Sequence, residues 1–178
     1  MTQGSSAWTP ILTDRLQLRR PCPGDRDAAI RIHSDPRTNR HHPAPETISV
    51  NSSAARFESI CEHWSNHGFG VWTVVLRSDP DTVVGFTGLT YRTVHGRDVL
   101  NLYYRYDPSV WGRGYASEGA RCAVRLANRL LSTFPVVAYT TPDNIGSQRT
   151  ALAAGLTRHE ELDIDNGRYT DIYLAQGW

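Results

Sequence analysis

The stretch Trp111-Gly112-Arg113-Gly114-Tyr115-Ala116-Ser117-Glu118 decides the fold of this 178-residue chain. It joins an aromatic-rich segment at 102–106, typical of a strand, to a helix expected over 117–132. Glycines at a strand-to-helix turn let the backbone approach a ligand because no Cβ intervenes. The N–H groups that open the helix have no intrahelical partner and lie at the positive end of its dipole. The stretch therefore predicts a site for a phosphate or pyrophosphate.

Two common phosphate-binding motifs are excluded by residues that the chain lacks. A Walker-type loop needs a lysine after its second glycine, and all 19 basic residues of this chain are arginine. A dinucleotide fingerprint needs a third glycine where Ser117 stands and an acidic residue near Phe134. A tight turn in which Gly114 serves only to reach a positive φ is the alternative interpretation of the loop.

The loop and its flanks together resemble a known family. The segment 107–118 is similar to the acetyl-coenzyme A loop of the GNAT superfamily, in its RimJ/RimL-like branch, which usually shows Pro-x-x-Trp-Gly-Lys/Arg-Gly-Tyr-Ala-Thr/Ser-Glu. Asn144-Ile145-Gly146-Ser147-Gln148-Arg149 resembles the Asn-x-x-Ser-x-Arg/Lys segment of the same branch. Segments 12–19, 84–89 and 171–174 resemble its first, third and last strands. These motifs stand in family order over nearly the whole chain.

The length and the hydrophobic patterning predict one domain over 1–178, with residues 1–10 as a loose N-terminus. The fold class expected is α+β: a mixed, mostly antiparallel central sheet flanked by helices on both faces. A helix is expected over 52–66 and a hairpin turn at 78–81. The resemblance adds a V-shaped splay between the strands at 104–106 and 135–140, where a pantetheine arm would lie.

The resemblance implies acetyl-CoA as co-substrate and no metal. It implies Ser147 as the general acid that protonates the departing thiolate, and a strand N–H near Tyr106 as a donor to the thioester oxygen. Because Asn and Ser are favoured helix N-caps, a purely local role for Asn144 and Ser147 is the alternative. The coenzyme-binding residues implied are Tyr104, Arg105, Tyr106, Trp111, Gly112, Arg113, Gly114, Tyr115, Ala116, Ser117, Asn144 and Ser147.

The general base is the point at which the sequence departs from the family pattern. Many relatives carry a glutamate just before the central strand, where this chain has Asn101, and Tyr103 fills a place where glycine is common. Another residue or water must serve as base, or the acceptor pocket is altered. Candidates for the acceptor side, which could equally be ordinary surface residues, are His41, His42, Glu46, Glu62 and His63. Two adjacent histidines alone fall short of a metal-ligand set.

Charge and composition limit the classes of binding partner that we expect for this chain. The net charge of +1 gives no broad attraction to nucleic acid, and the arginine row at 121, 125 and 129 is interpreted as a solvated helix face. No segment is long and apolar enough to predict a membrane span, and three widely spaced cysteines predict no disulfide framework. A soluble cytoplasmic monomer or homodimer is expected.

Two function classes stay open at this stage. The first is an enzyme that moves an acetyl group from acetyl-CoA to a primary amine, an α-amine of a protein, peptide or small molecule. The second is a coenzyme A-binding domain of the same fold with little or no catalytic activity, which the absence of a glutamate at Asn101 keeps open.

Overall fold

A computed structural model describes residues 7–178 of the chain. One sheet forms its centre, in the strand order β1-β2-β3-β4-β5-β6-β9-β7, with β8 paired to β9. Every pairing is antiparallel except that between β5 and β6. The strands are β1 (Ile11–Leu12), β2 (Leu16–Arg19), β3 (Val71–Leu76), β4 (Asp79–Val94), β5 (Arg97–Tyr106), β6 (Val136–Thr140), β7 (Thr157–Arg158), β8 (Ile164–Asp165) and β9 (Thr170–Gln176).

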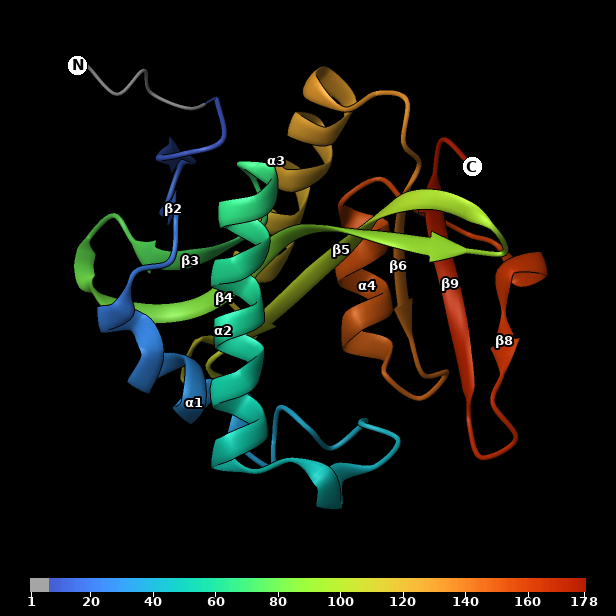
Figure 1. The fold of residues 1–178 in the computed structure, drawn as a ribbon, viewed down its shortest axis with the longest axis horizontal. Helices are drawn as coiled ribbons and strands as arrows, with labels where there is room; N and C mark the ends of the chain where they lie inside the picture. The colour runs from blue at the N-terminus through green and yellow to red at the C-terminus, as the bar shows by residue number, and fades with distance from the viewer. Residues whose placement is uncertain (1–6) are drawn as a thin grey trace.

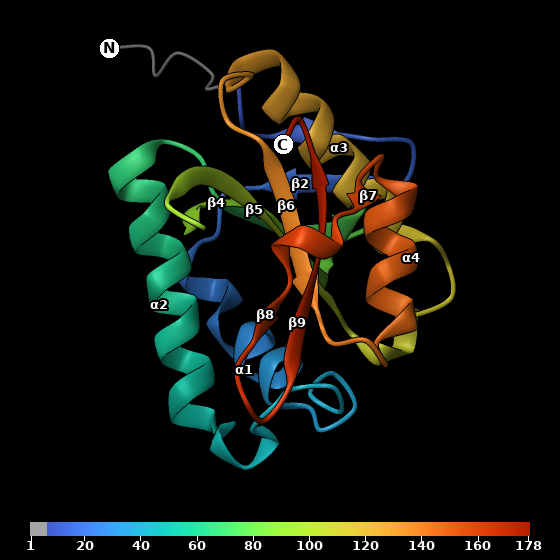
Figure 2. The ribbon, with the colours of Figure 1, turned by 90° about the vertical axis from the view of Figure 1, so that its right-hand side faces the viewer.

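Four helices cover the two faces of the sheet. They are α1 (Arg26–Ser34), α2 (Val50–His67), α3 (Tyr115–Leu130) and α4 (Ile145–Ala153). α1 packs against α2 on one face, and α3 packs against α4 on the other (Figure 2). The long hairpin of β4 and β5 crosses the middle of the molecule between these layers (Figure 1). The predicted α+β fold class is confirmed.

The splay between β5 and β6 is the feature that matters most for the site. The two strands are paired only at Leu100↔Val136 and Asn101↔Val137. Beyond Asn101 the strands diverge, so the β6-facing edge of residues 102–106 has no neighbouring strand. The predicted V-shaped opening is therefore present at the end of β5 that leads into the glycine loop.

Two helix starts differ from the sequence prediction. α3 begins at Tyr115, two residues earlier than expected, because Gly114 adopts φ 77° and already occupies the N-cap position. α2 begins at Val50 because Ser49, rather than a residue further along, caps it. The Ser49 Oγ accepts from Ser52 N at 3.1 Å, and Ser52 Oγ accepts from Ser49 N at 2.8 Å.

The hairpin between β3 and β4 turns earlier than predicted. Leu76 pairs with Asp79, so the turn falls at 77–78 and the expected turn over 78–81 is wrong. The pairing then shifts to Val75↔Val83, which leaves residues 80–82 without a cross-strand partner. Pro80, which has no N–H to donate, is accommodated in this bulge.

The chain start is only partly described. Residues 1–6 of the expected loose N-terminus lie outside the described residues. Trp8 lies against the body of the protein: its carbonyl accepts from Trp72 Nε1 at 2.6 Å, and its ring centroid is 5.0 Å from that of Phe69. Within residues 7–178, no helix combines the length and apolarity that crossing a bilayer requires.

Candidate active site

The glycine loop presents a row of free backbone donors. Gly112 has φ 75° and Gly114 φ 77°, both in the left-handed region that favours glycine. Within residues 7–178, the N–H groups of 112–117 donate no hydrogen bond to protein. They stand at the N-terminus of the 16-residue helix α3. This geometry is that of an anion-binding site.

The loop is held by contacts on both of its sides. Trp111 Nε1 donates to Tyr106 O at 2.9 Å, which ties the loop to the end of β5. Arg15 Nη1 donates to Arg113 O at 2.8 Å, and the Arg15 guanidinium lies 4.6 Å from the centroid of the Tyr115 ring. The loop is thus fixed before any ligand binds.

Glu118, in the first turn of α3, fixes Arg15 in turn. Its carboxylate accepts from Thr13 Oγ1 at 2.6 Å, from Arg15 N at 2.9 Å and from Arg15 Nε at 2.7 Å. Burial alone would raise the pKa of Glu118, but these hydrogen bonds outweigh it and the pKa is lowered. Glu118 is therefore ionised at neutral pH and links the β1–β2 turn to the loop.

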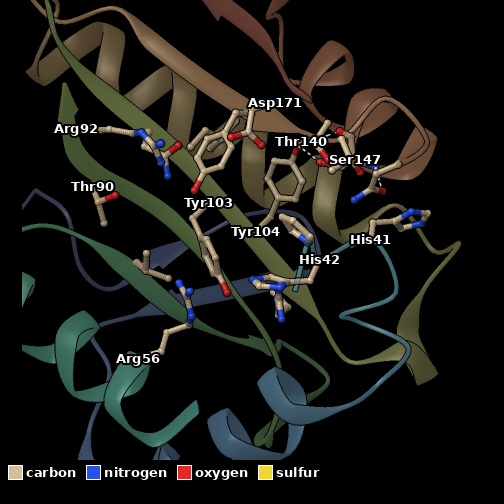
Figure 3. A pocket seen from close by; sticks show the side chains of 18 of the residues that line it. His41, His42, Arg56, Thr90, Arg92, Tyr103, Tyr104, Thr140, Ser147 and Asp171 are labelled. Carbon is tan, nitrogen blue, oxygen red and sulfur yellow. Dashed lines mark hydrogen bonds between the residues drawn. The ribbon is translucent and has the colours of Figure 1, made fainter. Parts of the chain in front are cut away.

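A large cavity opens beside the splay. Its volume is about 980 Å³, and its walls come from α2, β4, β5, the end of β6, the start of α4 and the two segments at 38–44 and 168–171 (Figure 3). Of the residues predicted for the coenzyme, Tyr104, Arg105, Asn144 and Ser147 line it. The loop residues 111–117 lie outside the cavity, at the other end of the splay. Tyr106 is buried, with its hydroxyl against α3.

Two hydroxyl groups meet where the splay reaches the cavity. Tyr104 Oη donates to Ser147 O at 2.8 Å and lies 3.0 Å from Ser147 Oγ. Because the tyrosine proton is directed to the carbonyl, the serine hydroxyl donates to the Tyr104 oxygen. Burial raises the pKa of Tyr104 to about 12, so it stays protonated at neutral pH. The Tyr104 and Ser147 hydroxyls together therefore form a group that can donate a proton.

Asn144 has the local role that the sequence left open. Its Oδ1 accepts from Ser147 N at 3.1 Å and caps α4. This cap also fixes the backbone of Ser147, whose carbonyl holds Tyr104. A capping role for Asn144 thus supports the hydroxyl pair and does not compete with it.

Tyr103, which replaces the common glycine, is paired with a buried histidine. His33 Nδ1 lies 2.8 Å from Ala29 O, and its Nε2 lies 2.8 Å from Tyr103 Oη. A carbonyl only accepts, so Nδ1 carries the proton and Nε2 accepts from Tyr103. Burial lowers the pKa of His33 to about 3, so its ring is neutral at pH 7. No local sequence pattern predicts this pair, because the two residues are 70 positions apart.

The position at which many relatives carry a glutamate lies in the wall of the cavity. Asn101 lines the cavity, and its Oδ1 is buried with no hydrogen-bond partner among the described residues. Asp171, on β9, is the one carboxylate in the lining, and burial raises its pKa. The sequence indicates only that Asp171 lies in a closing strand; in the structure it shares the cavity wall with Tyr103 and Tyr104 (Figure 3).

The acceptor-side candidates divide into two groups. His41, His42 and His63 line the cavity, whereas Glu46 and Glu62 are not part of its wall. In the part of the chain that the structure describes, no three histidine, cysteine or acidic side chains cluster as metal ligands would.

Comparison with known proteins identifies the family. Residues 15–157 match the model of the acetyltransferase (GNAT) domain. The chain belongs to the GNAT acetyltransferase family. It is 34% identical over 103 residues to the FsC-acetyl coenzyme A-N(2)-transacetylase of Aspergillus fumigatus; this match spans 52% of the chain and 41% of the length of the fungal protein.

Solved structures share the fold at low identity. An acetyltransferase from Agrobacterium tumefaciens superposes with a TM-score of 0.78 at 22% identity, covering 94% of each chain. RimL, a ribosomal L7/L12 alpha-N-protein acetyltransferase in complex with coenzyme A, superposes with a TM-score of 0.66 at 15% identity, covering 94% of this chain and 96% of its own. At these identities the likeness concerns the fold.

Proposed function

We propose that this protein transfers an acetyl group from acetyl-CoA to a primary amine. One arrangement carries the proposal: free backbone donors at 112–117 and a hydroxyl pair at Tyr104 and Ser147 lie at opposite ends of one splay between β5 and β6. Family membership supports it, as does the fungal relative, which is named a transacetylase that uses acetyl-coenzyme A.

The residues present fit acetyl-CoA as co-substrate. Residues 112–117 would hold its pyrophosphate through backbone N–H groups. The unpaired edge of β5 at 102–106 would hydrogen-bond the pantetheine arm, since backbone groups in such a position need partners. These contacts are shaped or supported by Trp111, Tyr115, Ala116 and Asn144. The backbone of β5 contributes to them at Arg105 and Tyr106.

The chemistry assigns a role to each of three side chains. The neutral amine attacks the thioester carbonyl, a C–N bond forms, and the C–S bond breaks to release thiolate. Tyr104 holds the Ser147 hydroxyl in place before the reaction. The serine hydroxyl then turns to protonate the thiolate, and it regains a proton from solvent, to which the proton of the amine is finally released. Asp171 takes the proton that the amine loses, and its raised pKa makes it a stronger base than an ordinary aspartate.

The acceptor group is best matched by an α-amine, as in the RimJ/RimL-like branch. An α-amine titrates near pH 8 and a lysine amine near 10.4. An active site without the usual glutamate at Asn101 favours the amine that is more often neutral. RimL, which shares the fold, is named an alpha-N-protein acetyltransferase.

A second candidate function is coenzyme A binding without efficient chemistry. The observation that favours it is the buried, unpaired Oδ1 of Asn101 where relatives carry glutamate. One experiment distinguishes the two functions. Thiol release from acetyl-CoA is measured with and without primary amines, and the amine is then analysed by mass spectrometry. Amine-dependent thiol release with an acetylated product supports the transferase. Coenzyme A binding in calorimetry, without any amine-dependent thiol release, would instead support a coenzyme-binding domain without efficient chemistry.

A further inference from the structure

The cavity is far more cationic than the protein as a whole. The chain carries 19 arginines and 18 acidic residues, close to balance. The cavity wall has one carboxylate, Asp171, against the four arginines Arg56, Arg92, Arg105 and Arg168. A concave site lined mainly by one sign of charge raises the local concentration of ligands of the opposite sign.

The two half-buried arginines of the wall form no direct ion pair with a carboxylate among the described residues, although the charge of Asp171 acts on Arg92 from within the same wall. Arg105 Nη1 donates to Asn39 Oδ1 at 2.5 Å, a neutral acceptor. The guanidinium of Arg92 lies 4.1 Å from the centroid of the Tyr139 ring, again a neutral partner. Five arginines outside the cavity do form ion pairs with carboxylates: Arg15, Arg19, Arg31, Arg37 and Arg158. A partly buried charge is normally paired, so the wall has capacity for an anion from outside.

The arginines stand where the far end of an acceptor would lie. Arg56, from α2, and Arg92, from β4, lie on one side of Tyr103, whereas Ser147 lies beyond Tyr104 on the other (Figure 3). Arg56 is exposed at the rim and makes no hydrogen bond or ion pair within residues 7–178. An amine that reaches the hydroxyl pair therefore leaves the rest of its molecule beside these two guanidinium groups.

We propose that the acceptor amine carries an anionic group, a carboxylate or a phosphate, which Arg92 binds with help from Arg56 at the rim. The inference rests on the proposed acetyl transfer and names the substrate class of that same site. Guanidinium groups suit both anions because their planar N–H donors match paired oxygens.

The same charges discriminate against polycationic acceptors. A second ammonium in this cavity would meet Arg56, Arg92, Arg105 and Arg168, with Asp171 as the one opposing charge. Like charges nearby also disfavour the protonated form of the reacting amine, which helps to deliver it neutral. An anionic substituent offsets the repulsion during binding.

The test is a panel of acceptors in matched pairs, assayed by thiol release from acetyl-CoA. β-Alanine, γ-aminobutyrate and ε-aminocaproate are each compared with their carboxamides, which varies the distance between amine and anion, and the dipeptide amides Ala-Asp and Ala-Asn form a matched pair of α-amines. O-phosphoethanolamine is compared with ethanolamine, and spermidine is the polycation. We expect a higher kcat/KM for at least one carboxylate acceptor, and for the phosphate acceptor, than for the uncharged partner of each. Whichever of the two anions gives the larger preference identifies the anion that the site binds.

Variants then assign the preference to the arginines. Arg92→Met keeps most of the apolar stem and should lower the ratio of kcat/KM for the anionic over the uncharged acceptor by about tenfold, as for a lost hydrogen bond to a charged group. Arg56→Met, at an exposed position, should lower it about two- to fivefold. Arg92→Lys keeps the charge but not the planar donors, so its ratio should lie between those of wild type and Arg92→Met. Arg121→Met, on the solvent face of α3, is the matched control and should leave the ratio unchanged.

The outcomes separate this inference from the proposed function. Thiol release with uncharged amines or spermidine, but not with anionic amines, would overturn the inference and leave acetyl transfer standing. A preference for anionic amines that Arg92→Met and Arg56→Met both retain would also overturn it. No thiol release with any amine would overturn both proposals together.

Discussion

Replacing Glu118 by alanine should destabilise the protein and loosen the glycine loop. Glu118 is 8% exposed, and its carboxylate accepts from the Thr13 hydroxyl, the Arg15 amide and the Arg15 guanidinium. Removing it leaves the Arg15 amide without its acceptor and leaves the Thr13 hydroxyl only its longer contact to Leu16 O at 3.3 Å, at about 1 kcal/mol each. The Arg15 side chain is 47% exposed and can turn to water, so its ion pair contributes at most about 1 kcal/mol.

The expected loss is thus about 2–3 kcal/mol in the free energy of unfolding, measured by urea denaturation. For a chain of this length it corresponds to a fall in Tm of roughly 4–12 °C. Coenzyme A affinity should also fall, since Arg15 would no longer be held against Arg113 O. Glu58→Ala, at an exposed position of α2, is the control and should change stability by less than about 0.5 kcal/mol.

The pH dependence gives an independent check. The pKa of Glu118 is lowered in the folded state, so its contribution is present above its unfolded value, near 4.5, and is lost as the pH falls through the folded value. The stability difference between wild type and Glu118→Gln should therefore be largest at neutral pH and shrink below about pH 4.5. A Glu118→Ala protein as stable as wild type, or a Glu118→Gln difference that is the same at pH 7 and pH 3.5, would refute this account of the loop anchor.

Three further predictions concern catalysis. Ser147→Ala should lower kcat roughly 10²-fold with little change in coenzyme affinity; an unchanged kcat would assign the acid role to Tyr104 or water. Asp171→Asn should lower kcat/KM by a similar factor of about 10², because the amine then lacks its proton acceptor; a kcat/KM within a few-fold of wild type would exclude Asp171 as base. With wild type, a peptide with a free N-terminus should be acetylated faster than a blocked peptide that carries lysine, with activity rising from about pH 6 to 8.5; faster acetylation of the blocked peptide would overturn the α-amine assignment.

The sequence was sufficient for the fold and for the loop because both depend on local patterns. Two glycines between an aromatic strand and an amphipathic helix require a particular turn, and the structure has Gly112 and Gly114 at positive φ. The order of strands and helices followed from motifs spread along the chain, and the splay between β5 and β6 followed from the family resemblance. Element ends were less predictable, since the start of α2 depends on which of several serines acts as the cap.

The composition of the cavity could not be predicted, because it depends on contacts between distant segments. Within its own helix or strand, each of three residues resembles an ordinary polar residue: Asp171 on β9, Arg56 on α2 and Arg92 on β4. Only the folded sheet brings them to one wall. The pair of His33 and Tyr103 shows the same limit: a histidine on α1 is neutral because the fold buries it, and its hydrogen-bond partner is a tyrosine 70 positions later.

The most direct test of the central claim, that the loop at 112–117 binds the coenzyme, is calorimetric titration of coenzyme A into wild type and two valine variants. Gly114→Val places a side chain among the free donors. Gly96→Val, in the β4–β5 turn, imposes the same strain, since Gly96 has φ 76° and Gly114 φ 77°, and an added Cβ at Gly96 meets nothing within 4 Å. We expect wild type and Gly96→Val to bind coenzyme A and folded Gly114→Val to show no binding. Undiminished binding by Gly114→Val would contradict the account.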